Sequence, residues 1–235
     1  PVYPATGEKR RQEPDFVFGG RTFTRYYSST RQFRNNLSFA IGWNHTWDDV
    51  LISETSTSIV YSDEEGNYER FLLQSGTRFR GENSVDVVLD KVSQGATVWQ
   101  MRLPNGEIKE FGANGRLTAL RTPNSPLTDL AFTYDSEGST QTVTDGQGRV
   151  LTFAYVDNML ASITLPDGRV VQYGYDSDHN LTSVTYPDGG VRRYLYNESG
   201  LSGSPDQRYH MTGIVAEDGR RFASFSYDAR GRVIA

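Results

Sequence analysis

Residues 159–176, MLASITLPDGRVVQYGYD, are followed at residues 180–197 by NLTSVTYPDGGVRRYLYN, and the two stretches are variants of one pattern. Leu160 and Leu181 occupy equivalent positions 21 residues apart. A fixed period of this length is typical of repeat proteins, because one unit cannot bury its own apolar face and must stack on its neighbours. The pattern therefore predicts that function belongs to the array rather than to any single residue.

Each copy has the pattern of an antiparallel hairpin. A strand that ends in threonine leads into Pro-Asp-Gly, where proline limits φ and the Asp-Gly pair accepts the positive φ of a tight turn. In the returning strand Tyr173 and Tyr175 share one face, so stacked units would place tyrosines in cross-strand rows. The other face, with Gln172 and Gly174, is too polar for a packed barrel interior and fits a sheet wound around a partly wet space.

The repeat continues through the second half of the chain with one irregular step. Tyr134, Tyr155, Tyr175, Tyr196 and Tyr227 are separated by 21, 20, 21 and 31 residues. The last step contains an insertion at residues 198–207, rich in Gly, Ser and Pro, which predicts a surface loop that leaves the strand register intact. The residues that we assign to the structural repeat are Tyr134, Tyr155, Pro166, Asp167, Gly168, Tyr173, Tyr175, Asp176, Pro187, Asp188, Gly189, Tyr194, Tyr196, Asp218, Gly219, Tyr227 and Asp228.

The composition agrees with many short strands joined by tight turns. The 235 residues include 23 glycines and 14 tyrosines, and Asn-Gly and Asp-Gly pairs recur along the chain. We predict an all-β chain whose antiparallel hairpin repeats form a curved, spiralling sheet. Residues 1–95 are expected to form a β-rich segment that precedes the repeats, and residues 96–235 the repeats themselves. Strands are expected at residues 16–18, 21–26, 69–74, 85–89 and 97–103.

Charge and residue usage exclude several classes of protein. A net charge of −5 gives the whole chain no electrostatic footprint for nucleic acid, and no apolar run approaches the roughly 20 residues that span a bilayer. The absence of cysteine excludes disulfides, thiol catalysis and cysteine-ligated metals. Residues 1–34 have a local excess of positive charge, which we interpret as a solvated strand face rather than a nucleic-acid patch. The basic residues there are Lys9, Arg10, Arg11, Arg21, Arg25, Arg31 and Arg34.

No spacing in the sequence is that of a metal or dinucleotide site. His45, His179 and His210 lie in no ligand or triad pattern. Residues 176–180, Asp-Ser-Asp-His-Asn, resemble the start of a calcium loop, but the glycine at its sixth position and the glutamate at its twelfth are missing. Residues 146–148, Gly-Gln-Gly, lack the third glycine and the helix of a dinucleotide loop. We therefore predict no metal site and no cofactor.

Carboxylates and tryptophans offer two other interpretations. Many carboxylates could form a glycosidase pair, but four of them precede a glycine in a turn, so a turn role explains these four and we predict no catalytic residue. Trp43, Trp47 and Trp99 either pack in the core or form a platform for sugar rings. The turn carboxylates in question are Asp145, Asp167, Asp188 and Asp218.

The repeated residues resemble a known family. Over residues 99–235 the chain resembles the YD repeat of the Rhs proteins. The shared pattern is Tyr-Asp, then Gly or Asn, Leu, a Val-Thr or Ile-Thr pair, Pro-Asp-Gly and a closing Tyr-x-Tyr-Asp. The opening is similar to the segment that commonly precedes these repeats, through Pro1-Val-Tyr-Pro-Ala-Thr-Gly-Glu-Lys9, Asp15-Phe16, Phe23-Thr-Arg-Tyr-Tyr-Ser28 and Gly42-Trp-Asn-His45.

The resemblance implies a non-enzymatic scaffold, part of a hollow β-shell that encloses a C-terminal toxin domain of the same parent chain. Such proteins are bacterial polymorphic toxins, often type VI secretion effectors, and related repeats occur in insecticidal toxin complexes and teneurins. The implied partners are that toxin domain and secretion-spike or adaptor proteins, and the implied location is outside the producing cell or in a target cell. The family's self-cleaving aspartate motif is missing from these residues, so we expect no autoproteolysis. The alternative is a module whose aromatic rows bind cell-surface carbohydrate.

Overall fold

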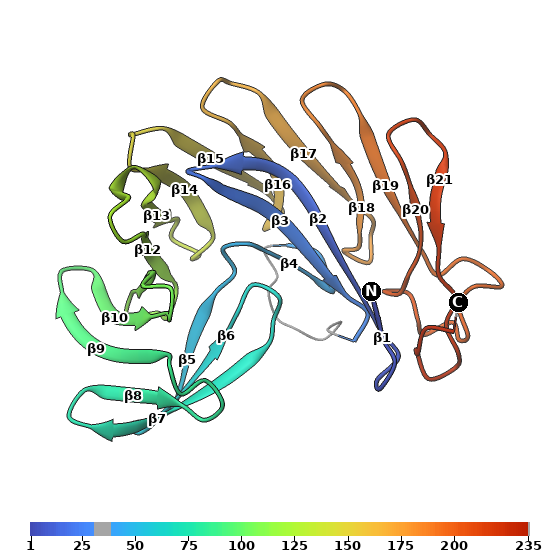
Figure 1. Ribbon diagram of the computed structural model, residues 1–235. Helices are drawn as coiled ribbons and strands as arrows, with labels where there is room; N and C mark the ends of the chain where they lie inside the picture. Colours follow the sequence, from blue (N-terminus) through green and yellow to red (C-terminus); the bar gives the residue numbers. More distant parts are fainter. Residues whose placement is uncertain (31–38, 235) are drawn as a thin grey trace. The chain divides into compact units, whose positions relative to one another are not determined.

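The structure is a computed structural model that describes residues 1–30 and 39–234. Within these residues the regular structure consists of 21 β-strands and one short 3-10 turn, η1 (Pro126–Thr128). Neighbouring strands run antiparallel, in hairpin after hairpin along the chain (Figure 1). The prediction of an all-β chain built from antiparallel hairpins is confirmed.

The chain divides into two compact units. The first contains Pro1–Asp15, Thr24–Asn44 and Thr152–Ala235, and the second contains Phe16–Phe23 and His45–Leu151. The opening residues of the chain therefore pack in the same unit as its last strands. The boundary near residue 95, which we drew from the start of the repeat pattern, remains a prediction.

The first unit holds the clearest repeats and most of the opening strands. β1 (Val2–Tyr3), β2 (Glu8–Phe18), β3 (Arg21–Ser28) and β4 (Trp43–His45) form a small sheet in chain order, and the ends of β2, β3 and β4 pass into the other unit. The repeat strands pair with one another in chain order as well. They are β15 (Val150–Val156), β16 (Met159–Thr164), β17 (Val170–Tyr175), β18 (Leu181–Thr185), β19 (Val191–Tyr196), β20 (Met211–Val215) and β21 (Arg221–Ser224).

The second unit is a longer run of hairpins. Its strands also pair antiparallel with their neighbours in the chain. Its core is formed by large apolar side chains such as Phe71, Phe111 and Leu130, all buried. The strands are β5 (Val50–Thr55), β6 (Ser58–Ser62), β7 (Tyr68–Ser75), β8 (Arg78–Gly81), β9 (Val88–Gln94), β10 (Thr97–Arg102), β11 (Ile108–Phe111), β12 (Leu117–Arg121), β13 (Leu130–Tyr134) and β14 (Thr140–Asp145).

The Pro-Asp-Gly turns close the hairpins of the repeats. Between β16 and β17 the Gly168 amide donates to the Leu165 carbonyl, and Gly168 has a φ of 83°, which a residue without Cβ adopts at no steric cost. The Asp167 carboxylate accepts the Arg169 amide at 3.1 Å, so the turn satisfies its own backbone. Gly189, in the next repeat, has a φ of 86°. The same turn thus recurs with the same glycine requirement.

The insertion joins β19 to β20 and leaves these strands paired antiparallel. Tyr196 and Met211 face each other, with a register shift between Leu195 and Tyr196. The insertion is not wholly a surface excursion, because Gln207 is buried and its side-chain amide donates to the Asp228 carbonyl at 2.6 Å. Part of the loop therefore folds back onto the turn that follows β21.

Four of the five expected strand segments lie in strands, and the fifth begins late. Residues 16–18, 21–26 and 69–74 fall in β2, β3 and β7, and the expected strand at residues 97–103 coincides with β10 except at Leu103, which follows its end. The expected strand at residues 85–89 was wrong over its first three residues, since β9 starts only at Val88. The Glu69 carboxylate accepts the Asn83 and Ser84 amides, and the Val87 amide donates to the Ser84 carbonyl, so residues 83–87 form a turn.

Candidate functional site

Four of the repeat tyrosines make the same hydrogen bond, from the phenol to a backbone carbonyl near the start of an earlier strand. In the first unit the hydroxyl of Tyr175 donates to the Leu160 carbonyl at 2.7 Å, and that of Tyr196 donates to the Leu181 carbonyl at 2.9 Å. Burial raises the pKa of these phenols, which keeps them protonated as donors. The same bond joins Tyr134 to Leu117 and Tyr227 to Met211.

These tyrosines also mark an irregularity in strand pairing. The register shifts between Gly174 and Tyr175, where Tyr175 faces Leu181, and the shift recurs at the corresponding tyrosine of other repeats. Tyr155 lies at such a shift as well, opposite Leu160. A β-bulge bends its strand and increases the local twist. The sequence period located the tyrosines, but nothing in it indicated the bulge.

The aspartate after the tyrosine builds the other turn of each repeat. Asp176 accepts the Asp178 amide at 3.0 Å and the Asn180 amide at 2.9 Å, and its second oxygen accepts the Asn180 side chain. Asp228 makes the corresponding pair of bonds with Arg230 and Arg232. In residues 176–180, the segment that resembled a calcium loop, the Asp176 carboxylate therefore stabilises a turn by accepting its backbone amides. Asp188 and Asp218, in the Pro-Asp-Gly turns, each accept one amide two residues later.

A charged pair lies fully buried in the first unit. The Arg25 guanidinium, on β3, donates from Nε to Asp15 at 2.7 Å and from Nη2 to the other Asp15 oxygen at 2.8 Å. Both side chains have no exposed surface. Burial alone would lower the pKa of Arg25, but the carboxylate beside it outweighs burial and the pKa is raised well above its usual value. The guanidinium is therefore charged, and it binds the carboxylate in the bidentate geometry in which arginine binds most strongly.

Tyrosines from successive repeat elements complete this buried site. Tyr173, on β17, donates its hydroxyl to Asp15 at 3.1 Å, and Tyr186, in the turn after β18, donates to the other oxygen at 3.2 Å. Arg25 donates in turn to the hydroxyl of Tyr194, on β19, at 2.9 Å. We call Asp15, Arg25, Tyr173, Tyr186 and Tyr194 the arginine cluster. It joins the opening strands to three consecutive elements of the repeats.

Aromatic side chains extend the same contact toward β20. The Trp43 indole donates to the Tyr196 hydroxyl at 3.0 Å, and its ring packs against Tyr194 with centroids 5.0 Å apart. The Tyr27 hydroxyl donates to the Tyr209 carbonyl and accepts the Met211 amide. The tyrosine face of the repeats is thus covered by opening strands in this unit, whereas Gln172 on the other face is exposed.

Several sequence interpretations change at this point. Trp43, Trp47 and Trp99 are all buried, so no tryptophan ring is available as a sugar platform. Of the basic residues in 1–34, Arg25 and Lys9 are buried rather than part of a solvated face. Arg31 and Arg34 lie outside the described residues.

Sequence reasoning missed Asp15, Arg25 and Tyr186 as site residues. One signal was present, because Arg25 alternates with Phe23 and Tyr27 along β3, and period-two alternation puts all three on one face. The structure buries that face. An arginine between two aromatic residues on a strand face is thus a candidate for a buried, paired charge.

The second unit buries a different charged group. Lys109, on β11, donates to Asp49 at 2.7 Å and to the Tyr61 hydroxyl at 2.9 Å, and its ammonium lies 3.7 Å from Glu64. Tyr61 donates in turn to Asp49. Burial, and then the charge of Asp49, raises the pKa of Glu64 to about 7. We call Asp49, Tyr61, Glu64 and Lys109 the lysine cluster.

Within the described residues, no group of three or more His, Asp or Glu side chains could hold a metal ion. His45 pairs with Asp48 at 3.4 Å, and His210 packs edge-on against Tyr227. His179 occupies a turn with a φ of 62°. Among the described residues, no helix is long and apolar enough to cross a membrane.

Comparison with known sequences identifies two segments. The RHS Repeat matches residues 156–191 and 175–201, and a domain of unknown function, DUF6531, matches residues 1–71. No curated protein sequence matches the chain.

Solved structures to which the chain is similar share little sequence with it. The crystal structure of TcdB2-TccC3-Cdc42 has 13% identity and a TM-score of 0.36, with 90% of this chain and 12% of that one covered. The Photorhabdus luminescens Tc holotoxin pore with a mutated TccC3 has 13% identity and a TM-score of 0.39, with 97% and 14% covered. TcdB2-TccC3 without its hypervariable C-terminal region has 16% identity and a TM-score of 0.37, with 95% and 11% covered.

The chain thus spans only a small part of the length of these structures. The RHS match coincides with the strands in which the tyrosine bonds and Pro-Asp-Gly turns recur, and the DUF6531 match contains Asp15 and Arg25 of the arginine cluster. The chain therefore contains RHS repeats at residues 156–201, and its residues 1–71 match the DUF6531 domain.

Proposed function

We propose that the chain is a non-enzymatic scaffold, part of a hollow β-shell that encapsulates a C-terminal toxin domain of the same parent chain. The parent protein is then an Rhs-type polymorphic toxin or secretion effector, of the kind that type VI systems deliver. It acts outside the producing cell or inside a target cell, and its further partners are secretion-spike or adaptor proteins. Residues 1–95 form the segment that precedes the repeats, and residues 96–235 form the repeats.

The recurring tyrosine bond is the observation that carries this proposal. Each bond ties a phenol to the backbone of an earlier strand, as in Tyr175 to Leu160 and Tyr196 to Leu181, so the repeated side chains are occupied in holding strands together. The turn aspartates are occupied as well, since Asp167 and Asp176 accept backbone amides of their own turns. A wall needs this kind of repeated internal bonding, whereas a catalyst needs groups directed at a substrate.

The arginine cluster supports the same role. Buried charge pairs contribute little net stability but penalise every arrangement that separates the partners. Arg25 and Asp15 therefore favour a single packing arrangement of the opening strands against β17 and β19. A shell needs such a fixed arrangement, because its first strands must pack in the correct position. No toxin chemistry is required of these residues.

The test is electron microscopy of the full-length parent protein, combined with limited proteolysis. We expect a hollow particle and a C-terminal domain that resists protease until the shell is unfolded by denaturant. A solid particle would contradict the proposal. So would a C-terminal domain that is cleaved in the intact protein as fast as when it is produced alone.

A further inference from the structure

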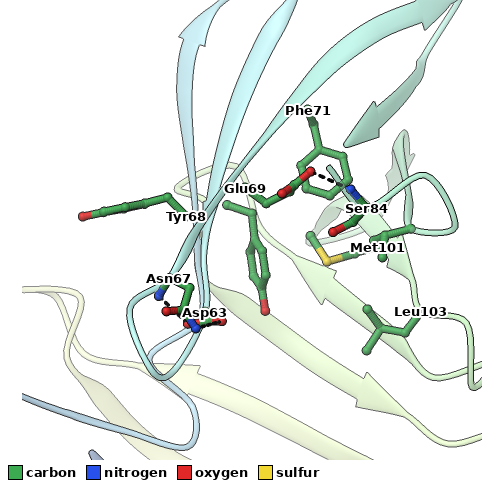
Figure 2. A pocket seen from close by; sticks show the side chains of 10 residues that line it. Asp63, Asn67, Tyr68, Glu69, Phe71, Ser84, Met101 and Leu103 are labelled. Carbon is green, nitrogen blue, oxygen red and sulfur yellow. Dashed lines mark hydrogen bonds between the residues drawn. The ribbon is translucent and has the colours of Figure 1, made fainter. Parts of the chain in front are cut away.

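A pocket in the second unit has no part in the scaffold role. It has a volume of about 200 Å³ and is lined by residues of β6, β7 and β10 and of the loops beside them. Phe71, Met101 and Leu103 give it an apolar wall, and Asp63 and Glu69 supply carboxylates. Figure 2 shows Met101 and Leu103 on the side opposite Asp63, with Tyr68 directed away.

The walls of the pocket are held in place. Phe71 and Met101 are buried in the core of the unit. The Tyr61 ring also lines the pocket, and its hydroxyl is fixed by Asp49 and Lys109 of the lysine cluster. A cavity with such fixed walls is preorganised, so a ligand does not have to order it on binding.

The two carboxylates lack a cationic partner. Asp63 accepts the backbone and side-chain N–H groups of Asn67 at 2.7 and 2.9 Å, and Glu69 accepts the Asn83 and Ser84 amides at 2.7 and 3.0 Å. Among the described residues neither forms an ion pair, unlike Glu54, Glu64 and Asp90. Their donors are neutral, so the negative charge at the pocket is not compensated.

The nearby lysine does not supply that compensation. The Lys109 ammonium lies 2.7 Å from Asp49 and 3.7 Å from Glu64, so its charge is already shared by two carboxylates of its own cluster. Lys109 therefore does not neutralise Asp63 or Glu69, whose negative charges favour a cation.

We propose that this pocket binds an aliphatic ammonium group, with its alkyl stem against Phe71, Met101 and Leu103 and its charge beside Asp63 and Glu69. The apolar wall suits the stem and the carboxylates suit the charge, the same division that a lysine side chain shows in proteins. The volume is below the roughly 300 Å³ at which sites for drug-sized molecules begin, and it suits a group of a few heavy atoms. The ammonium comes either from a lysine of a partner peptide or from a free alkyl diamine.

The experiment is an NMR titration of the whole chain with three probes. Nα-acetyl-lysine N-methylamide represents the peptide source, and 1,5-diaminopentane represents the free amine. Nα-acetyl-norleucine N-methylamide has the same stem without the charge. We expect saturable shifts at Met101 and Leu103 with at least one amine, and about tenfold weaker binding of the norleucine probe, because a hydrogen bond to a charged group is lost.

Matched variants test which carboxylate binds the ammonium group. Glu69→Gln keeps an oxygen that can accept the loop amides and removes the charge, so we expect about a fivefold rise in Kd, and Asp63→Asn should act in the same direction. Glu82→Gln removes an exposed carboxylate that does not line the pocket and should leave Kd unchanged. Thermal melts of each variant verify that the fold is kept.

The outcomes separate cleanly. Binding of the lysine probe alone identifies a peptide as the source, and binding of the diamine alone identifies a free amine. The proposal is overturned if neither amine saturates up to about 10 mM. It is also overturned if norleucine binds as well as lysine, or if Glu82→Gln weakens binding as much as Glu69→Gln does.

Discussion

The two units bury charge in different ways. In the first, Arg25 holds Asp15 with two hydrogen bonds, and neither side chain is exposed. In the second, Lys109 contacts Asp49 through one oxygen, remains slightly exposed, and shares its surroundings with a further carboxylate, Glu64. Tyrosine hydroxyls complete both clusters.

The difference separates a charge that cannot titrate from one that can. A guanidinium stays protonated at every physiological pH, so the charge of Arg25 does not change and the arginine cluster holds the same contacts throughout this range. The lysine cluster contains Glu64, whose pKa is raised to about 7 by burial and by Asp49. Its charge therefore changes within the physiological range, and so should the stability of the second unit.

The largest effect should follow from breaking the arginine pair. Arg25→Met leaves Asp15 buried without its cation, and we expect the free energy of unfolding to fall by about 3–5 kcal/mol. Urea unfolding followed by tryptophan fluorescence measures it.

Two control variants test the cause of that loss. Adding Asp15→Leu to Arg25→Met should restore much of the stability, because an apolar pair can replace a buried ion pair. Arg10→Met, at a partly exposed pair with Glu8, should change stability by less than about 1 kcal/mol. If Arg25→Met costs no more than Arg10→Met, the cluster does not form in solution.

The second prediction concerns the pH dependence of the lysine cluster. Because the pKa of Glu64 is about 7 in the folded chain and its ordinary value is 4.5, the folded state holds more protons than the unfolded state between these pH values. The free energy of unfolding should therefore fall as pH rises from about 4.5 toward 7, by at most about 3 kcal/mol and less where solvent screens the charge.

Urea unfolding at pH 5 and pH 7.5 measures this slope, with Glu64→Gln as the control. The variant cannot titrate at this position, so its stability should change less over the same interval. Equal pH dependence in both proteins would mean that Glu64 titrates normally. Arg25→Met, by contrast, should destabilise the chain to a similar extent at both pH values.

The third prediction compares the tyrosines of the two clusters. Tyr173→Phe removes a hydroxyl that donates to the fully buried Asp15, and we expect a loss of about 2 kcal/mol. Tyr61→Phe should cost about 1 kcal/mol, because Lys109 of that cluster is partly exposed and solvent can replace part of the lost hydrogen bonding. Chemical denaturation of both variants measures the difference, and a larger loss for Tyr61→Phe would reverse our ranking of the clusters.

The smallest effect should be the same in both units. Tyr134→Phe in the second unit and Tyr175→Phe in the first each remove one phenol-to-carbonyl bond. We expect each to lower the free energy of unfolding by about 1 kcal/mol. Equal losses would show that one repeated bond operates in both units despite their different clusters. A loss confined to Tyr175 would restrict it to the clearest repeats.

Much of the local structure could be predicted from the sequence. The turns at Asp167 and Asp188 lie where Pro-Asp-Gly indicated them, because glycine with positive φ is a local requirement. The antiparallel pairing of the hairpins followed from the same turns, and the insertion before Met211 leaves β19 and β20 paired, but the register shift at Tyr196 was not indicated. These features depend on residues close together in the chain.

The arginine cluster could not be predicted in this way. Arg25 and Tyr194 are 169 residues apart, and Asp15 and Tyr186 are 171 apart. Alternation shows which residues share a strand face, but not which distant surface covers that face. For the same reason the excess of positive charge in residues 1–34 was interpreted as solvated, although Arg25 is buried.

The sequence by itself determined the period, the turns and the alternation of the hairpins, because each of these depends on backbone preferences over a few residues. Only the tertiary structure decided which tyrosines would bind the arginine pair and which would bind a backbone carbonyl. Tyr173 and Tyr175 share one face of one strand, yet the first donates to Asp15 and the second to Leu160. That choice depends on which segment packs against each ring, and packing brings together residues that no local pattern relates.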